Sequence, residues 1–415
     1  MMNVKASQVY IFMGFWTSLA NAMMFTTYAI YEVIALGLNP LQLLLVGMVL
    51  EAAVLLFEGI TGVVADYYSR RRSVIMGMFV LGVGFALAGS AIWLGDKGLA
   101  MSSFAWLLLS QMVSGIGYTF ISGADTAWIV DEVGEKNAGK LFLRARRIGL
   151  FGTLLGIAIS VFLSSQGANL PYLAGGLMYL LLGVYLLFYM KETKFVRPER
   201  RSGAFSHWKS MKETWLSGSR VIRRHPLLLM MLIVTVFSGA ASEGYDRLWQ
   251  AHMITEIGFP ADIPFSAAIW VGLIAVLSTL LSLPVMWIAE KRIDMSRERI
   301  VFKGMLILTL VRITAIMVLA LSSGFAWALA AVLLYDMVRM LSAPFYDTWL
   351  NLNIESKSRA TVLSMMSQSD ALGQTAGGPF VGWIGSRFSL RASLVAAAVL
   401  LTPILAVYSR MQRKE

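Results

Sequence analysis

Cysteine is absent from this chain, and histidine is scarce. Without cysteine there can be no disulfides, no thiol catalysis and no thiolate metal sites. The three histidines, His207, His225 and His252, lie far apart and lack the spacing of metal ligands. No nucleophile and base stand in a catalytic arrangement. The sequence therefore predicts neither an enzyme nor a bound metal or cofactor.

Charged residues are also few. They make up 14% of the chain, whereas a soluble domain carries about 25%. Hydrophobic residues make up 57% and form long runs. A helix needs about 20 apolar residues to cross a bilayer, and these runs reach that length. A soluble protein is thereby excluded, and the chain is predicted to be an all-α membrane protein.

Twelve apolar runs are separated by short connections, except for a longer basic segment in the middle. We predict two six-helix bundles, 1–190 and 226–415, joined by a linker at 191–225. In the linker, "HWKSMKETWL" places two tryptophans on one helical face, which fits either an interfacial helix or a solvated linker. The predicted spans are 9–36, 41–66, 73–95, 103–130, 141–166, 171–190, 226–255, 265–289, 300–322, 325–350, 359–386 and 390–409.

Lysine and arginine are unevenly distributed along these spans. If the N-terminus is cytoplasmic, nearly all of them fall on cytoplasmic loops or on span ends facing that side. This positive-inside pattern predicts two cytoplasmic termini and a multi-pass protein of the cytoplasmic membrane. The net charge of +11 is then a topology signal, and no nucleic-acid partner is expected. The exceptions are Lys97, Arg387 and Arg391 outside, and Arg247, Arg312 and Arg339 within spans.

The two predicted halves repeat several features at one spacing. The string "FAW" occurs at 104 and again at 325, each time opening a span. Trp128 and Trp349 are separated by the same 221 positions. Each comes shortly after an Asp-Thr pair, at 125–126 and 347–348, and the offset between these pairs is one position longer. Shared offsets of this kind indicate duplicated halves, the architecture of carriers that work by alternating access.

The turn between the second and third spans reads "TGVVADYYSRRRS" at 61–73. Three consecutive arginines hold this hairpin on the cytoplasmic side. Asp66 lies at the end of a helix and is expected to need a partner. Gly62 is expected to let another helix approach closely. A plain positive-inside loop would explain the arginines, but neither Asp66 nor Gly62.

At this point the chain resembles the major facilitator superfamily over its whole length. The signature of that family reads Gly, three residues, Asp, and then Arg-x-Gly-Arg-Arg/Lys. The resemblance implies a cytoplasmic gate that Asp66 clamps shut. The matching residues are Gly62, Asp66, Arg70 and Arg71, while Tyr67 and Ser69 depart from the pattern.

Three longer stretches are similar to bacterial drug exporters of this superfamily. They are "NPLQLLLVGMVLEAAVLLFE", "GYTFISGADTAWIVDEVGE" and "SEGYDRLWQAHM". Two family features of proton coupling are missing, however. Gln111 stands where many proton-coupled relatives have an arginine, and the fifth span lacks the Gly-Pro step of antiporters. The motifs alone therefore leave proton antiport open.

Acids outnumber bases within the predicted spans, although charge at membrane depth costs about 2.5–3.5 kcal/mol on insertion scales. Some of these acids must face water, carry a proton or await a cation. The candidates for proton coupling are Glu51, Glu58, Glu243, Asp246, Asp336 and Asp370, and Asp125 also falls within a span.

Several of these acids could instead have a structural role. Glu58 could pair with the arginine-rich start of the fifth span, at 144–147. Glu243 and Arg247, four residues apart, should form a helical ion pair. Asp336 and Arg339, one turn apart, could form a fixed or an exchanging pair. Arg312 is expected to pair with a neighbouring acid, whereas Asp370, which has no local base, is a candidate to carry a proton.

The sequence thus predicts a secondary active transporter, acting as a monomer, that exports a small amphipathic organic compound and is coupled to protons. Uptake or facilitated diffusion of a polar solute, or the handling of lipid by a flippase of the same fold, are the alternatives. The residues predicted to line the central cavity are Asn21, Tyr28, Gln111, Tyr118, Arg247 and Arg339.

Overall fold

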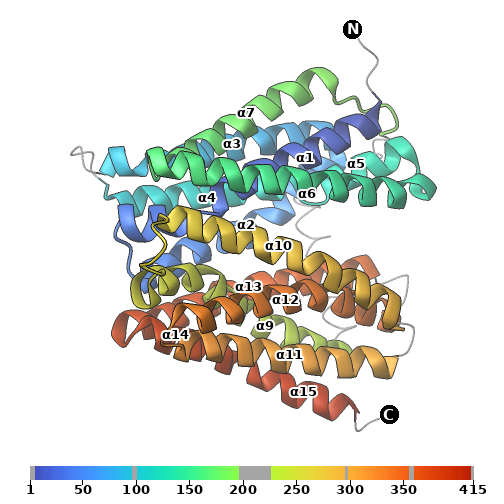
Figure 1. Ribbon diagram of the computed structural model, residues 1–415. Helices are drawn as coiled ribbons and strands as arrows, with labels where there is room; N and C mark the ends of the chain where they lie inside the picture. The colour runs from blue at the N-terminus through green and yellow to red at the C-terminus, as the bar shows by residue number, and fades with distance from the viewer. Residues whose placement is uncertain (1–4, 96–100, 196–225, 295–297, 355–358, 413–415) are drawn as a thin grey trace. The chain divides into compact units, whose positions relative to one another are not determined.

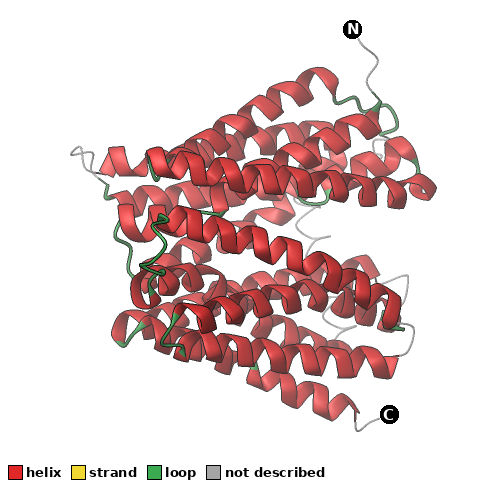
Figure 2. Ribbon diagram, in the orientation of Figure 1, coloured by secondary structure: helices red, strands yellow, loops and turns green. Residues whose placement is uncertain are grey.

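The structure is a computed structural model that describes residues 5–95, 101–195, 226–294, 298–354 and 359–412. Every regular element within these ranges is a helix (Figure 2). In chain order they are α1 (Ala6–Phe25), η1 (Ile30–Ala35), α2 (Pro40–Tyr67), α3 (Arg70–Gly95), α4 (Ser103–Ile121), α5 (Ala124–Val133), α6 (Glu135–Gln166), α7 (Leu170–Tyr189), α9 (Pro226–His252), η2 (Met253–Ile257), α10 (Ala267–Arg292), α11 (Glu298–Leu321), α12 (Phe325–Asn353), α13 (Arg359–Arg387), α14 (Leu390–Leu400) and α15 (Thr402–Gln412).

These helices follow the twelve predicted spans within a few residues. In the described ranges, 11 helices or joined helix pairs are long and apolar enough to cross a membrane. The one remaining predicted span, the eleventh, corresponds to α13, which has the required length with 29 residues, but its middle carries serine, glutamine and aspartate. The helix predicted within 191–225 lies outside the described residues.

Side-chain caps fix where several spans begin. Three serines stand just before α4, α10 and α14, and each accepts a hydrogen bond from a backbone N–H three residues later. The first N–H groups of a helix have no partner within the helix, so a serine hydroxyl stabilises that end. These caps, Ser102, Ser266 and Ser389, therefore mark sharp boundaries between loop and span.

The chain divides into two compact units, which are considered separately. Unit 1 comprises Met1–Leu38 and Val49–Ala204, and unit 2 comprises Asn39–Met48 and Phe205–Glu415. In unit 1, α1 packs on α6, and α3 packs on both α4 and α7 (Figure 1). In unit 2, α13 packs on α9, and α11 packs on α12. The first turns of α2 belong to unit 2, whereas the sequence suggested a boundary at residue 190.

The first and seventh spans end in the same way. Each finishes in a π-helical turn, η1 and η2, and each turn is closed by a glycine with positive φ. The glycines are Gly37, with φ of 65°, and Gly258, with φ of 75°. They stand 221 positions apart, the offset already seen for Trp128 and Trp349. The structure thus adds a feature to the predicted duplication, because π-helical turns are rare and recur here at equivalent places.

A buried aromatic ring also lies at the start of each of these two π-helical turns. Tyr31 and His252 are again 221 positions apart, and both are fully buried. The Tyr31 hydroxyl donates to the carbonyl of Ala88 at 2.8 Å, and His252 Nε2 lies 3.2 Å from the carbonyl of Leu319. In each half, an aromatic side chain at the end of the first span therefore contacts a backbone carbonyl of the third span.

The repeated tryptophans lie in the core of their respective units. Trp128, in α5, is 1% exposed, and Trp349, in α12, is 0% exposed. The halves differ at this point in the backbone. The fourth span is broken into α4 and α5 at Gly123, which has φ of 71°, whereas α12 runs on continuously through Pro344.

Candidate functional site

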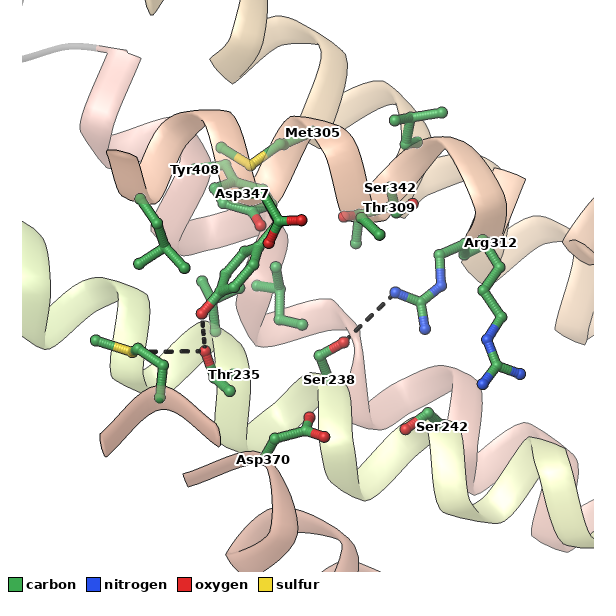
Figure 3. Close-up of a pocket in the computed structure, with 18 of the residues that line it drawn as sticks. Thr235, Ser238, Ser242, Met305, Thr309, Arg312, Ser342, Asp347, Asp370 and Tyr408 are labelled. Carbon is green, nitrogen blue, oxygen red and sulfur yellow. Dashed lines mark hydrogen bonds between the residues drawn. The ribbon is translucent and has the colours of Figure 1, made fainter. Parts of the chain in front are cut away.

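Unit 2 contains a cavity of about 430 Å³, a size that suits a small organic molecule. Its walls come from α9, α11, α12, α13 and α15, as Figure 3 shows. Apolar side chains alternate with hydroxyl groups around it. Of the residues predicted from sequence, Arg339 and Asp370 lie in this wall.

Asp370 projects into the cavity from the middle of α13 (Figure 3). Its Oδ2 accepts a hydrogen bond from Nε2 of Gln374, one turn later, at 2.8 Å. Among the ion pairs of the described residues, none involves Asp370. This agrees with the expectation that Asp370 has no local base. Arg312 and Arg339 act on the carboxyl group electrostatically, but neither forms an ion pair with it.

Arg312, on α11, reaches the same cavity. Its Nη1 donates to the hydroxyl of Ser238 at 3.4 Å, and its Nη2 donates to the hydroxyl of Tyr335 at 3.3 Å. Within the described ranges Arg312 forms no ion pair, so the prediction that it pairs with an acid was wrong. The reason is geometric, because the neighbouring helices present hydroxyl groups to the guanidinium.

Arg339 pairs with Asp246, and its Nη1 lies 2.5 Å from Oδ1 of that carboxylate. The prediction had placed Arg339 with Asp336, one turn earlier on α12. Asp336 instead accepts a hydrogen bond from the hydroxyl of Ser278, on α10, at 2.6 Å. The two side chains of α12 thus bind to different helices, which spacing along one helix could not reveal.

The predicted helical pair in α9 is confirmed. Arg247 Nε lies 3.0 Å from Oε1 of Glu243, and Glu243 is only 5% exposed. Two glycines flank the pair. A Cβ placed on Gly47 of α2 would overlap the Glu243 carboxyl and lie 2.9 Å from Arg247 Nε, and one on Gly378 of α13 would lie 3.3 Å from Glu243 Cγ. The buried pair therefore fills space that side chains at these two positions would need.

Unit 1 has a separate cavity of about 360 Å³. Asn21 and Tyr118, two predicted cavity residues, line it together with the membrane acid Asp125. Tyr179 donates a hydrogen bond to Oδ1 of Asn21 at 2.8 Å. Tyr28 and Gln111, also predicted, are buried and do not line this cavity. They are 7% and 4% exposed.

Glu51 and Glu58 lie seven residues apart on α2, and both are half-buried. Glu58 is hydrogen-bonded to the side chain of Ser122, in the break between α4 and α5. In the described part of the chain, Glu58 forms no ion pair with the arginines at 144–147. In place of the ion pair that was considered for Glu58, its side chain thus contacts a hydroxyl group.

Two acids were missed although they fall inside predicted spans. Glu32, in η1, is 0% exposed, and its Oε1 accepts a hydrogen bond from the Tyr172 hydroxyl at 3.3 Å. Asp347, near the end of α12, lines the cavity of unit 2. A complete list of acids within the span boundaries would have found both residues.

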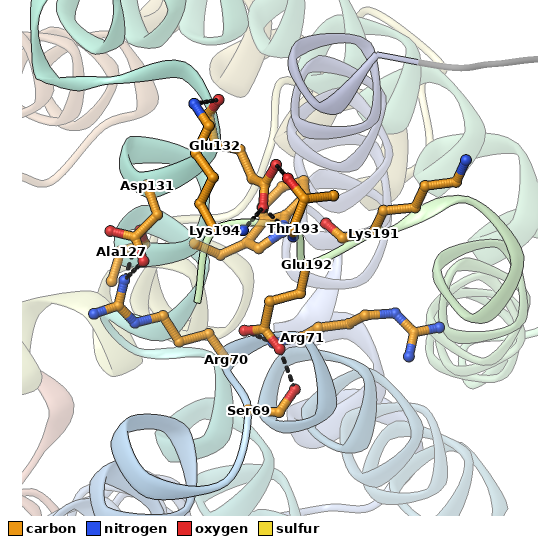
Figure 4. Close-up of polar contacts among 11 residues, drawn as sticks. Ser69, Arg70, Arg71, Ala127, Asp131, Glu132, Lys191, Glu192, Thr193 and Lys194 are labelled. Atoms are coloured by element: carbon orange, nitrogen blue, oxygen red, sulfur yellow. Dashed lines mark hydrogen bonds and ion pairs between the residues drawn. The ribbon is translucent and has the colours of Figure 1, made fainter. Parts of the chain in front are cut away.

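The arginine-rich turn lies at the junction of α2 and α3 in unit 1 (Figure 4). Arg70 pairs with Asp131 and donates to the carbonyl of Ala127 at 3.0 Å. Arg71 donates to the carbonyls of Leu187, at 2.7 Å, and of Met190. Both arginines thus join the start of α3 to the ends of other helices.

Glu192 completes this arrangement from the other side. Its carboxylate accepts hydrogen bonds from the Ser69 hydroxyl, at 2.5 Å, and from the backbone N–H of Arg71, at 3.2 Å (Figure 4). A carboxylate at the start of a helix and a guanidinium at the end of one both complement the helix dipole. Helices α3 and α7 therefore cap each other through Glu192 and Arg71.

Gly62 and Asp66 are the other two signature residues of the turn. A Cβ on Gly62 would meet no atom of the described residues within 4 Å, so the expected close approach of another helix is not seen in the part of the chain that the structure describes. The side chain of Asp66 lies outside the described residues, and its role as a gate clamp stays a prediction.

In the described ranges, no three His, Asp or Glu side chains gather as metal ligands. The chemistry on offer consists of carboxyl, guanidinium and hydroxyl groups around two cavities. Such groups can bind a small molecule and exchange protons.

Comparison with known proteins gives several relatives. One is an uncharacterized MFS-type transporter of Bacillus subtilis (strain 168), YxaM, 25% identical over 370 residues, or 88% of this chain and 86% of YxaM. Among solved structures, a mutant of the nucleoside transporter NupG superposes with a TM-score of 0.77 at 12% identity, over 98% of this chain and 100% of that one. A bacterial homolog of the human lysosomal transporter Spinster, inward-facing and unoccupied, gives 0.72 at 16% identity, over 98% and 96%.

The low identities to the solved structures establish the fold alone. The sequence profile described as Major Facilitator Superfamily matches residues 10–377, which is most of the chain. On this match, together with the helical fold and the membrane-spanning lengths, the chain belongs to the Major Facilitator Superfamily of transporters.

Proposed function

We propose that this protein is a secondary active transporter that exports a small amphipathic organic compound, coupled to protons. The two units would tilt about a site near the middle of the membrane, as in other transporters built from repeats. We further propose that it acts as a monomer in the cytoplasmic membrane, with both termini in the cytoplasm.

The observation that carries the proposal is the position of Asp370. Its carboxyl group faces a ligand-sized cavity at membrane depth, held by an amide and by no cation among the described residues. A charge in such a place is costly unless it has a use. Protonation would remove the charge and change which conformation is favoured, and this is the requirement for coupling a proton to transport.

The test is transport in proteoliposomes under an imposed pH gradient, with a panel of cationic, neutral and anionic compounds. Asp370→Asn should abolish pH-driven transport while leaving counterflow, which needs no proton movement. Asp246→Asn should do the same if the pair with Arg339 must open during the cycle. Asp262→Asn, a change of the same type at an exposed loop position, is the matched control. Unchanged coupling in both membrane variants would contradict the proposal.

A second candidate function is uptake of a polar solute. The cavity of unit 2 is richer in hydrogen-bonding groups than the sequence suggested, since Ser238, Ser242, Thr309 and Ser342 all line it. The same assay separates the two functions. An importer would move the compound in the same direction as the protons, and it would favour polar compounds over amphipathic ones.

Lipid handling is the third candidate. It would need a cation that can reach a phospholipid head group, and Arg312 and Arg339 are the available residues because both line the cavity. A fluorescent phospholipid that changes leaflet faster in proteoliposomes than in empty liposomes would favour this function over the other two.

A further inference from the structure

Unit 2 contains three arginines at membrane depth, and one of them differs from the others. Arg247 and Arg339 each hold a carboxylate, at 3.0 Å and 2.5 Å. Arg312 does not, and the hydroxyl groups that it contacts lie at 3.3 Å and 3.4 Å. Guanidinium–carboxylate bonds are typically about 2.7–2.9 Å long. The contacts of Arg312 are therefore long and involve neutral partners.

The guanidinium of Arg312 also retains unused hydrogen-bonding capacity. Its Nε is buried and has no hydrogen-bond partner among the described residues. Its Cζ lies 5.5 Å from the centroid of the Tyr335 ring, which stabilises the cation from one face only. A guanidinium carries five N–H donors and is never neutral in proteins. A cation in this setting is costly unless an anion joins it.

The acids of the cavity do not supply that anion in this structure. The two acids that line the cavity are Asp347 and Asp370. Asp370 is hydrogen-bonded to Gln374 and interacts with Arg312 only electrostatically, without an ion pair. Asp246, which lies outside the cavity wall, is paired with Arg339. No ion pair joins Arg312 to any acid of the described chain. Figure 3 shows the Arg312 guanidinium directed into the cavity toward Ser238. The position beside Arg312 is thus suited to an anion that comes from outside the protein.

We propose that Arg312 binds the anionic group of the transported compound, so that the cavity of unit 2 is a site for amphipathic organic anions. This inference rests on the proposed transport function and specifies its substrate class. Ser238, bonded to the same guanidinium, would be a second donor to the anion.

The remainder of the cavity indicates the rest of the ligand. Apolar side chains form much of the wall, among them Val234, Met305, Leu308, Met366 and Ile404. They would enclose a hydrocarbon or aromatic body of modest size, and methionine adapts well to such ligands. A carboxylate, sulfonate or phosphate on that body would meet the planar guanidinium in a bidentate manner.

The experiment measures binding to the purified full-length protein in detergent. The probes share a naphthalene body and differ in the head group: 2-naphthoate, 2-naphthalenesulfonate, neutral 2-naphthamide and cationic 2-naphthylmethylammonium. Calorimetric titration gives the affinity of each. At least one of the two anions should bind the wild-type protein about tenfold more tightly than the amide, the expected worth of hydrogen bonds to a charged group.

The variants assign that preference to Arg312. Arg312→Gln should reduce the preference for the anion to about onefold, whereas Arg312→Lys, which keeps the charge, should retain part of it. Arg410→Gln removes an exposed arginine at the end of α15 and should leave the preference unchanged. Gel-filtration profiles establish that each variant is folded before it is titrated.

Two results would overturn the inference. The first is a wild-type protein that binds neither anion more tightly than the amide, including no binding of any probe at millimolar concentration. The second is an anion preference that survives Arg312→Gln. Either result would leave the transport function intact if pH-driven transport is still observed. Conversely, anion preference without transport would sustain this site and refute the proposed function.

Discussion

The substitution Gly47→Ala should destabilise the protein far more than is usual for this change. Alanine normally favours a helix over glycine by about 1 kcal/mol. At Gly47, however, the new methyl group would overlap the Glu243 carboxyl and lie 2.9 Å from Arg247 Nε. Glu243 is 5% exposed and is packed from the other side against Gly378, so it has little room to move away.

The expected magnitude follows from what the methyl group displaces. Overpacking a core costs about 1–3 kcal/mol, and breaking a buried ion pair costs about 3–5 kcal/mol. Partial relaxation places Gly47→Ala at about 2–4 kcal/mol. For a unit of this size, that corresponds to a fall of roughly 5–10 °C in unfolding temperature. The measurement is thermal unfolding of purified protein in detergent, followed by tryptophan fluorescence.

Gly62→Ala is the matched control on the same helix. A Cβ there meets no atom of the described chain within 4 Å, so the substitution should leave the unfolding temperature unchanged or raise it slightly. A second check combines Gly47→Ala with Glu243→Ala, which should cost less than the sum of the two changes because the shorter side chain leaves room for the methyl group. Equal unfolding temperatures for the Gly47 and Gly62 variants would refute the reasoning, because the Glu243 carboxyl would then move aside freely.

Two further predictions concern unit 1. Arg71→Ala should cost about 1 kcal/mol, since it removes the guanidinium from the last carbonyls of α7; Arg72→Ala, at an exposed neighbour, should cost much less, and equal losses of unfolding temperature would contradict this. Tyr179→Phe should also cost about 1 kcal/mol by removing the hydrogen bond to Asn21. A double-mutant cycle with Asn21→Leu should then give a coupling energy of similar size, and strictly additive losses would show that the bond contributes nothing.

Much of the fold could be predicted because hydrophobic length is a local property. A run of about 20 apolar residues has one stable solution in a bilayer, a helix that satisfies its own backbone. The twelve predicted spans accordingly match the observed helices, even at α13, where polar residues interrupt the run. The duplication could also be predicted from the sequence, because the offset between Trp128 and Trp349 is a property of the chain itself.

The candidate site was harder to predict from the sequence, because the partners of its charged residues come from other helices. The Glu243–Arg247 pair could be predicted since it closes within one turn of α9. The partners of Arg339 and Asp336 could not, because they stand on α9 and α10. Glu32 belonged to a predicted span, yet its contact with Tyr172 depends on packing between helices.

The sequence by itself determined that this protein is a helical membrane protein with repeated halves, since length, composition and offset are all readable along one dimension. The tertiary structure alone decided which charges are neutralised. Ion pairing depends on distances of a few ångströms between helices whose rotation and depth are set by packing. For that reason Arg312 was expected to have an acidic partner, and the folded chain instead presents it to a cavity.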